Sequence, residues 1–413
     1  MKKILLHVSL ISICFGADFH GKIIDKISLK TVENAEICDT KRCIKSDKNG
    51  SFHFKTDDKI LNILAYGYRP FRFNIDQNQS IQLNPINVHA LYLTFWGACP
   101  KSKTFQRTLN LLEHHNINSV VIDIKNEFGD LVYNSHLPQA KEYGAYKKVQ
   151  IKDIKQFISQ LKAKDAYLIA RIVVFKDELQ ASYNVDYAIK KDGKLWRNHD
   201  NLAWVDPFDR RVWEYTVDIA VDAAKKGFDE INFDYIRFPA KEGIVLSKEN
   251  TMQNRTKNIA DFLEYAKKRL RPYGVFLSVD TFGNICWVKG DSNIGQTVEV
   301  FAKHADYLCP MVYPSSFGSG SFGHKYPSEF PHEVVYKSIA HITDRIEPKR
   351  IRPWIQAFKD YTRRKKHYGA FEIQEQLRVE DELGTNGWMM WSPRSKYKQE
   401  YFDRNITSEA FCQ

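Results

Sequence analysis

The chain has 413 residues and a formal net charge of +11. This length is too great for one average domain and too small for three, so we expect one large domain and one small one. Lys and Arg residues are scattered over helix-like segments, and the densest run is only the four residues 363–366. The scatter argues against a nucleic-acid-binding protein and favours loose attraction to anionic envelope polymers.

The first residues have the pattern of a secretory signal peptide. Lys2 and Lys3 precede a mostly apolar run that ends near Gly16 and Ala17, which predicts a signal peptide over residues 1–17 and export to the periplasm or the medium. The alternative is a buried N-terminal strand. An exported chain can form disulfides, and the short spacing of Cys38 and Cys43 makes them the best pair, while Cys309 in an apolar strand is expected to be a buried thiol.

Residues 18–86 predict a small all-β sandwich. Short strand-like runs alternate with turns, and the DKNG sequence at 47–50 is typical of a hairpin turn. The region resembles the carboxypeptidase regulatory-like (transthyretin-like) module in its opening strand, Gly21 to Asp25, in DKNGSF and in the pair Gly67-Tyr68. That resemblance implies a structural or binding appendage and no carboxypeptidase activity.

Residues 87–413 predict a (β/α)8 barrel, so the whole chain is of the α/β class with a small β-sandwich in front. Helix-like segments with apolar residues at every third or fourth position include 104–115, 151–164, 210–227 and 254–270, and they alternate with strand-like segments. An open doubly wound sheet is the alternative, but no G-x-G-x-x-G follows the first strand. Eight strand candidates occur, at 90–97, 119–126, 166–175, 228–239, 275–283, 305–315, 350–358 and 387–393.

Polar residues recur on the inward face of these strands. In FDEINFDYIRFP, Ile231 and Phe233 share one face while Asn232 and Asp234 share the other. The same alternation turns Thr94 and Trp96 inward and gathers one set at the C-terminal mouth: Asp123, Lys125, Arg171, Asp234, Asp280, Tyr313 and Gln356. One buried charge is commonly half of a structural ion pair, but several at one barrel end are costly unless a function keeps them there.

Two carboxylates on adjacent strands are the pair that glycoside cleavage needs. We predict Asp234 as the nucleophile or transition-state stabiliser and Asp280 as the general acid/base, with Glu127 and Asp123 as substitutes. The long segment 177–209 is expected to form one wall of a cleft, and aromatic rings near the mouth would stack on sugars. The predicted substrate-binding residues are Asp123, Lys125, Glu127, Arg171, Trp204, Asp206, Tyr235, Arg237, Tyr313, Gln356 and Trp391.

The segment 201–239 resembles the hallmark of a family of glycoside hydrolase barrels found in many bacteria, distantly similar to α-amylase-like enzymes. The resemblance extends from about Leu91 to Tyr397. It implies that Asp234 takes the place of the catalytic Asp, whereas Asp280 stands where amylase-like enzymes commonly carry Glu, a departure that leaves the stereochemistry open. It also implies a reaction class more than a particular substrate.

The expected function is therefore an exported glycoside hydrolase that cleaves an envelope or extracellular polysaccharide. A non-catalytic carbohydrate-binding or envelope-assembly protein on the same barrel is the alternative, since fold does not fix function. A metal-dependent hydrolase comes third. No CxxC or HxxxH spacing occurs, so we expect no cofactor and no protein-built metal site.

Overall fold

The computed structural model of the chain describes residues 17–75, 80–114 and 116–403. Residues 1–16 of the predicted signal peptide lie outside these ranges, so that prediction is not tested. None of the helices in the described ranges is both long and apolar enough to cross a lipid bilayer.

The N-terminal region is a sandwich of two sheets, with strand order β4-β1-β7 in one and β3-β2-β5-β6 in the other. Side chains alternate along β4: Phe52 and Phe54 are buried against the second sheet, and the alternate residues Ser51, His53 and Lys55 are exposed. A disulfide joins Cys38 to Cys43 across two neighbouring strands and confirms that prediction. The strands are β1 (Ala17–Asp25), β2 (Glu36–Cys38), β3 (Cys43–Lys45), β4 (Ser51–Thr56), β5 (Ile60–Leu64), β6 (Phe71–Asn74) and β7 (Ile81–Leu83).

The rest of the chain is a closed barrel of eight parallel strands, as predicted. Closure excludes the open doubly wound sheet, because the last strand pairs with the first: Gly387 lies opposite Val88 and Met390 opposite Leu91. The strands are β8 (Val88–Leu93), β9 (Ser119–Lys125), β10 (Tyr167–Val173), β13 (Glu230–Asp234), β14 (Phe276–Phe282), β15 (Tyr307–Met311), β16 (Trp354–Gln356) and β17 (Gly387–Trp391).

Helices surround the barrel, and the four predicted ones form within a few residues of their expected bounds. In α5 the side chain of Asp209 caps the first turn, and Gly227 ends the helix at φ 107°, a conformation that glycine adopts without a steric penalty. The principal helices are α1 (Lys103–His114), α3 (Ile154–Lys162), α5 (Arg210–Lys226), α6 (Met252–Leu270), α7 (Val298–His304), α8 (Pro331–Ala340) and α9 (Ala370–Leu383), with short α2 (Pro138–Glu142) and α4 (Glu178–Tyr183) in loops.

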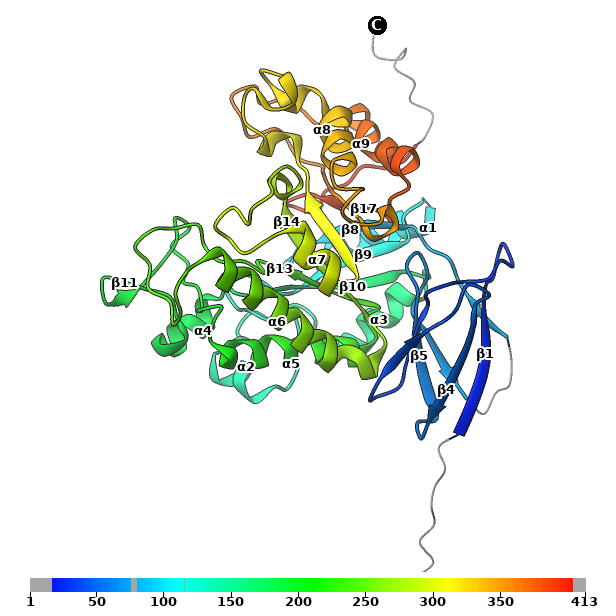
Figure 1. Ribbon diagram of the computed structural model, residues 1–413. Helices are drawn as coiled ribbons and strands as arrows, with labels where there is room; N and C mark the ends of the chain where they lie inside the picture. The colour runs from blue at the N-terminus through cyan, green and yellow to red at the C-terminus, as the bar shows by residue number, and fades with distance from the viewer. Residues whose placement is uncertain (1–16, 76–79, 115, 404–413) are drawn as a thin grey trace, which may run out of the picture.

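The sandwich packs against the end of the barrel where the strands begin (Figure 1). The side-chain amide of Asn62 in β5 donates to the backbone carbonyls of Arg271 and Pro272, just before β14. The backbone N–H of Gly67 donates to the hydroxyl of Tyr307 at the start of β15. The opposite end, where the strands finish, is left free of the sandwich, and it is the end that carries the predicted active-site residues.

Candidate active site

A single guanidinium stands at the centre of the barrel mouth. Arg171 of β10 donates to Asp123 Oδ1 at 2.5 Å and, through Nη2 and Nε, to Asp234 Oδ2 at 2.5 and 3.1 Å. The same Nε lies 3.9 Å from Asp280 Oδ2. Because Asp234 and Asp280 both approach one nitrogen atom, their carboxylates are less than a nanometre apart. The alternation rule therefore brings the two predicted catalytic acids into one pocket.

Asp280 is the most deeply enclosed of these carboxyl groups, with 1% of its surface exposed. Its Oδ1 accepts hydrogen bonds from the side-chain amide of Asn232 at 2.9 Å and from the indole of Trp354 at 2.7 Å. Burial, and then the negative charge of Asp234, raise the pKa of Asp280 well above its ordinary value. The free oxygen, Oδ2, can thus hold a proton on the side that faces Arg171 and Asp234.

Asp123 takes a supporting position behind the guanidinium. Its second oxygen accepts a hydrogen bond of 2.5 Å from the hydroxyl of Tyr92. Burial raises the pKa of Asp123, and Arg171 opposes that rise. The ring of Tyr92 in β8 stacks on Trp391 in the neighbouring β17 with centroids 3.9 Å apart, which fixes the ring whose hydroxyl donates to Asp123. Both oxygens of Asp123 are engaged. Asp234 and Asp280 line the cavity at the mouth, whereas Asp123 does not.

The free space is a cavity of about 180 Å³ at the barrel mouth. Its walls combine charged and aromatic side chains, the combination that binds a sugar ring by stacking and hydrogen bonding. Seven predicted site residues line it: Arg171, Asp234, Tyr235, Arg237, Asp280, Tyr313 and Trp391. Phe282, Gln296, Met311 and Trp354 complete the wall.

The backbone at Tyr235 is held in an unusual conformation beside Asp234. Tyr235 has φ 51°, which is uncommon for a bulky residue and is found where surrounding structure enforces it. In this conformation its N–H donates to Asp234 Oδ1 at 2.6 Å, while Lys176 lies 5.0 Å from its ring centroid. Asp234 therefore accepts hydrogen bonds at both oxygens and is fixed in orientation by Arg171 and its own neighbour.

A second pocket of about 490 Å³ adjoins the mouth cavity, and Arg237 lines both. Trp196 and Trp204 of the long segment 177–209 form part of its wall, which agrees with the prediction that this segment borders a cleft. The guanidinium of Arg237 lies 4.7 Å from the centroid of Trp204, and Trp204 is itself buried. Burial lowers the pKa of Arg237. The segment contains α4 and a short hairpin of β11 (Lys190–Lys191) and β12 (Lys194–Leu195).

The predicted inward orientation of Lys125 is wrong. Its ammonium is fully buried between the barrel and α5, 2.8 Å from Asp177 Oδ2 and 5.6 Å from the ring centroid of Tyr215. The physical reason is a bulge: Arg171 pairs with Asp123, but the next residue, Ile172, pairs with Lys125. The extra residue on β9 turns the following side chain to the helix side of the barrel.

Four other residues also lie outside the mouth cavity. Asp206 accepts backbone N–H groups from Phe208 and Ser247 and so ties the long segment to the loop after β13. Gln356 is fully buried and donates to the hydroxyl of Ser315 at 2.6 Å. Glu127 acts on Asp123 only through its charge, and Trp96, predicted to face inward, is 59% exposed beyond the end of β8.

Sequence reasoning missed several cavity residues for different reasons. Phe282 and Met311 continue the same alternation as Asp280 and Tyr313, so the strand pattern could have predicted that both side chains face the cavity. Gln296 follows β14 in an irregular loop, and its amide donates to the backbone carbonyl of Asp280 at 3.2 Å. No periodicity marks a loop residue of this kind, so only the folded chain identifies it.

Many solved structures are similar to this chain. The PgaB (BpsB) glycoside hydrolase domain from Bordetella bronchiseptica matches with a TM-score of 0.57 and 12% identity, over 75% of this chain and 95% of that chain, which shows a shared fold. A hypothetical protein from Ruminiclostridium thermocellum ATCC 27405 is 36% identical, over 46% of this chain and 96% of that chain, with a TM-score of 0.41. No curated protein matches the chain.

The family comparison covers the barrel. Residues 90–397 match the family described as "Putative glycosyl hydrolase domain" (DUF4015), a span that begins in β8 and ends beyond β17. This match takes in the whole of the mouth described above, including Asp234 and Asp280. The chain therefore belongs to this glycosyl hydrolase domain family.

Proposed function

We propose that this protein is an exported glycoside hydrolase that cleaves a polysaccharide of the cell envelope or the extracellular medium. Membership of a glycosyl hydrolase family and a glycoside-hydrolase-like barrel support the reaction class. The single observation that carries the proposal is the cavity in which Asp234 and Asp280 approach one guanidinium nitrogen. Export is supported by the apolar N-terminal segment and by the disulfide between Cys38 and Cys43.

In this mechanism Asp280 is the proton donor. Its raised pKa keeps a proton available on Oδ2, which can pass to the glycosidic oxygen as the bond breaks. Asp234, fixed by Arg171 and by the Tyr235 N–H, faces the positive charge that develops on the sugar ring and acts as the nucleophile or the transition-state stabiliser. Trp391 and Tyr313 contribute aromatic surface to the cavity wall, against which the sugar can pack.

The wall of the second pocket supports a polymeric substrate. Trp196, Trp204 and Arg237 border a space continuous in its lining with the catalytic cavity, so a sugar held there would be joined to the one being cleaved. Stacking surfaces beyond the reacting sugar are of use only for a chain of sugars. We therefore propose that the substrate is longer than a disaccharide.

The test is release of reducing ends from a broad panel of bacterial polysaccharides. Asp234→Asn and Asp280→Asn should each lower kcat by at least about 100-fold, as is typical when a general acid or base is removed. Asp344→Asn, the same chemical change at an exposed position, should leave activity unchanged. Full activity in both mouth variants would refute the catalytic assignment, and glycan binding without hydrolysis by the unaltered protein would favour the non-catalytic alternative.

A further inference from the structure

A second cluster of chemically active side chains lies on the sandwich, far from the barrel mouth. Asp18 and His20 belong to β1, and His53 belongs to β4. All three stand on the exposed face of the β4-β1-β7 sheet, since the alternate residues, among them Phe19 and Phe54, are buried in the sandwich core. Asp18, His20 and His53 have 58%, 72% and 56% of their side-chain surface exposed, so the cluster is open to solvent.

Strand register brings the two imidazoles together. His20 and His53 are directly opposite each other in the antiparallel β1–β4 pair, and their rings are stacked with centroids 4.2 Å apart and planes 2° from parallel. The Nε2 atoms of both rings lie on the side of the pair that faces Asp18. Residues opposite each other on one sheet face are the closest cross-strand neighbours, so the arrangement is a consequence of the pairing itself.

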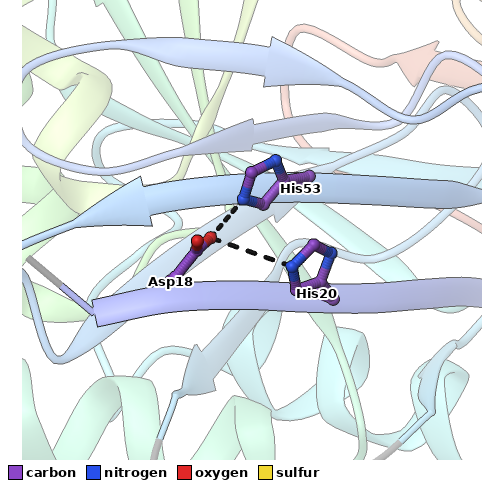
Figure 2. A group of neighbouring side chains, drawn as sticks. All are labelled: Asp18, His20 and His53. Atoms are coloured by element: carbon purple, nitrogen blue, oxygen red, sulfur yellow. Dashed lines mark hydrogen bonds and ion pairs between the residues drawn. The ribbon is translucent and has the colours of Figure 1, made fainter.

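Asp18 completes the cluster from two positions before His20 on the same face of β1. Its Oδ1 contacts Nε2 of His53 and lies 3.9 Å from Nε2 of His20 (Figure 2). The three ligand atoms, one from each residue, all lie within 4.8 Å of one another.

Two imidazole nitrogens and one carboxylate oxygen form a ligand set with a defined preference. Zn²⁺ binds this combination at about 2.0–2.2 Å in tetrahedral geometry, with water in the fourth position. Ca²⁺ and Mg²⁺ select all-oxygen sites and are poorly matched to imidazole. The open face above the cluster gives an ion free access and leaves room for the water ligand.

We propose that Asp18, His20 and His53 bind a Zn²⁺ ion that joins the start of β1 to β4. The ion would add a cross-link between two strands that already interact here through backbone pairing, the Asp18–His53 contact and the Phe19–Phe52 ring contact. Binding to the folded pair and not to the separated strands stabilises the sandwich by mass action. The site is independent of glycoside cleavage, because the sandwich packs against the opposite end of the barrel from Asp234.

The sequence gives no short-range indication of this site. The two histidines are on separate strands, and only the β1–β4 hydrogen-bond register makes them neighbours. Asp18 and His20 are only two residues apart, but His53 follows Asp18 by 35 positions. The absence of CxxC or HxxxH motifs therefore does not bear on a site assembled across a sheet.

The experiment is calorimetric titration of Zn²⁺ into the full-length protein purified without a polyhistidine tag. Wild type should bind one equivalent at this site, and His20→Gln/His53→Gln should lose that equivalent. Asp18→Asn alone should weaken binding by at least about tenfold, since even residues that only support metal ligands contribute 10- to 100-fold to affinity. The matched control is His199→Gln, because His199 forms an exposed pair with Asp200 that lacks a second imidazole; it should bind Zn²⁺ like wild type.

A second measurement reports on the ligands directly. Co²⁺ added to wild type should give the visible absorption of a low-symmetry site with nitrogen ligands, and the double histidine variant should not give it. Zn²⁺ should raise Tm in wild type and in His199→Gln but not in the double variant, whose exposed substitutions leave the fold intact in metal-free buffer. No binding by wild type, an unchanged equivalent in the double variant, or displacement of the ion by millimolar Mg²⁺ would each overturn the proposal.

Discussion

The two ends of the barrel interior treat buried charge in opposite ways. At the end where the strands begin, Arg352 Nη1 donates to both oxygens of Glu230 at 2.9 and 2.8 Å, and both side chains are 0% exposed. At the mouth, the guanidinium of Arg171 forms ion pairs with both Asp123 and Asp234 and also lies near Asp280. One end is balanced, whereas the other has more carboxyl groups than cations to pair with them.

The difference separates a structural ion pair from a site built for chemistry. In a buried pair of one carboxylate and one cation, each charge is neutralised by its partner, so the carboxylate stays ionised and does not exchange a proton. At the mouth, burial and then the charge of the neighbouring Asp234 raise the pKa of Asp280, the carboxyl group least well paired with Arg171, and so favour its protonated form. The protein retains this costly arrangement at the mouth, where Asp234 and Asp280 line a cavity, and not at the end that the sandwich covers.

The largest expected effect comes from breaking the buried Glu230–Arg352 ion pair at the end where the strands begin. Arg352→Met leaves Glu230 buried without its cation, and the loss of one partner of a buried pair costs about 3–5 kcal/mol of unfolding free energy. Chemical denaturation measured by circular dichroism should show this loss. The double variant Glu230→Gln/Arg352→Met should recover a large part of it, since no charge is then left unpaired; a double variant as unstable as the single one would contradict the ion-pair explanation.

At the mouth, the expected effect is a pH dependence of catalysis. The raised pKa of Asp280 means that the acid form, which donates the proton, is present below that pKa and is lost as pH rises through it. The rate should therefore fall about tenfold per pH unit on the basic side of the optimum. The measurement is kcat/KM against pH on the substrate found in the polysaccharide panel, and a rate that stays constant well into the alkaline range would argue against Asp280 as the acid.

The smallest expected effect is on stability, and its sign is opposite to that at the balanced end. The pKa of Asp280 is raised in the folded protein above its ordinary value. Asp280 therefore lowers stability progressively as the pH rises above the ordinary value, until the folded pKa is passed. Asp280→Asn should therefore raise Tm at neutral pH, by about 1–2 °C in a domain of this size. The gain should vanish toward pH 4. Differential scanning calorimetry at several pH values tests this, and a lower Tm for the variant at neutral pH would contradict it.

Periodicity predicted the barrel and the acids at its mouth because regular strands alternate strictly. Asp234, Asp280 and Arg171 were placed correctly from the sequence for that reason. The side-chain orientation of Lys125 was predicted wrongly because the bulge opposite Arg171 breaks the alternation. The local sequence does not indicate this bulge. The His20–His53 pair could not be predicted either, because it depends on the register between two strands that are distant in the sequence.

The position of the sandwich has a consequence for how the enzyme can be held. Hydrogen bonds from Asn62 and Gly67 fix it beneath the strand starts, so its outer face and the catalytic opening point to opposite sides of the molecule. A partner that binds the exposed face of the sandwich, whether a metal-bridged neighbour or an anionic wall polymer, leaves the mouth of the barrel unobstructed. A protein attached through the small domain would therefore have its mouth cavity directed away from the attachment surface, where a glycan can reach it.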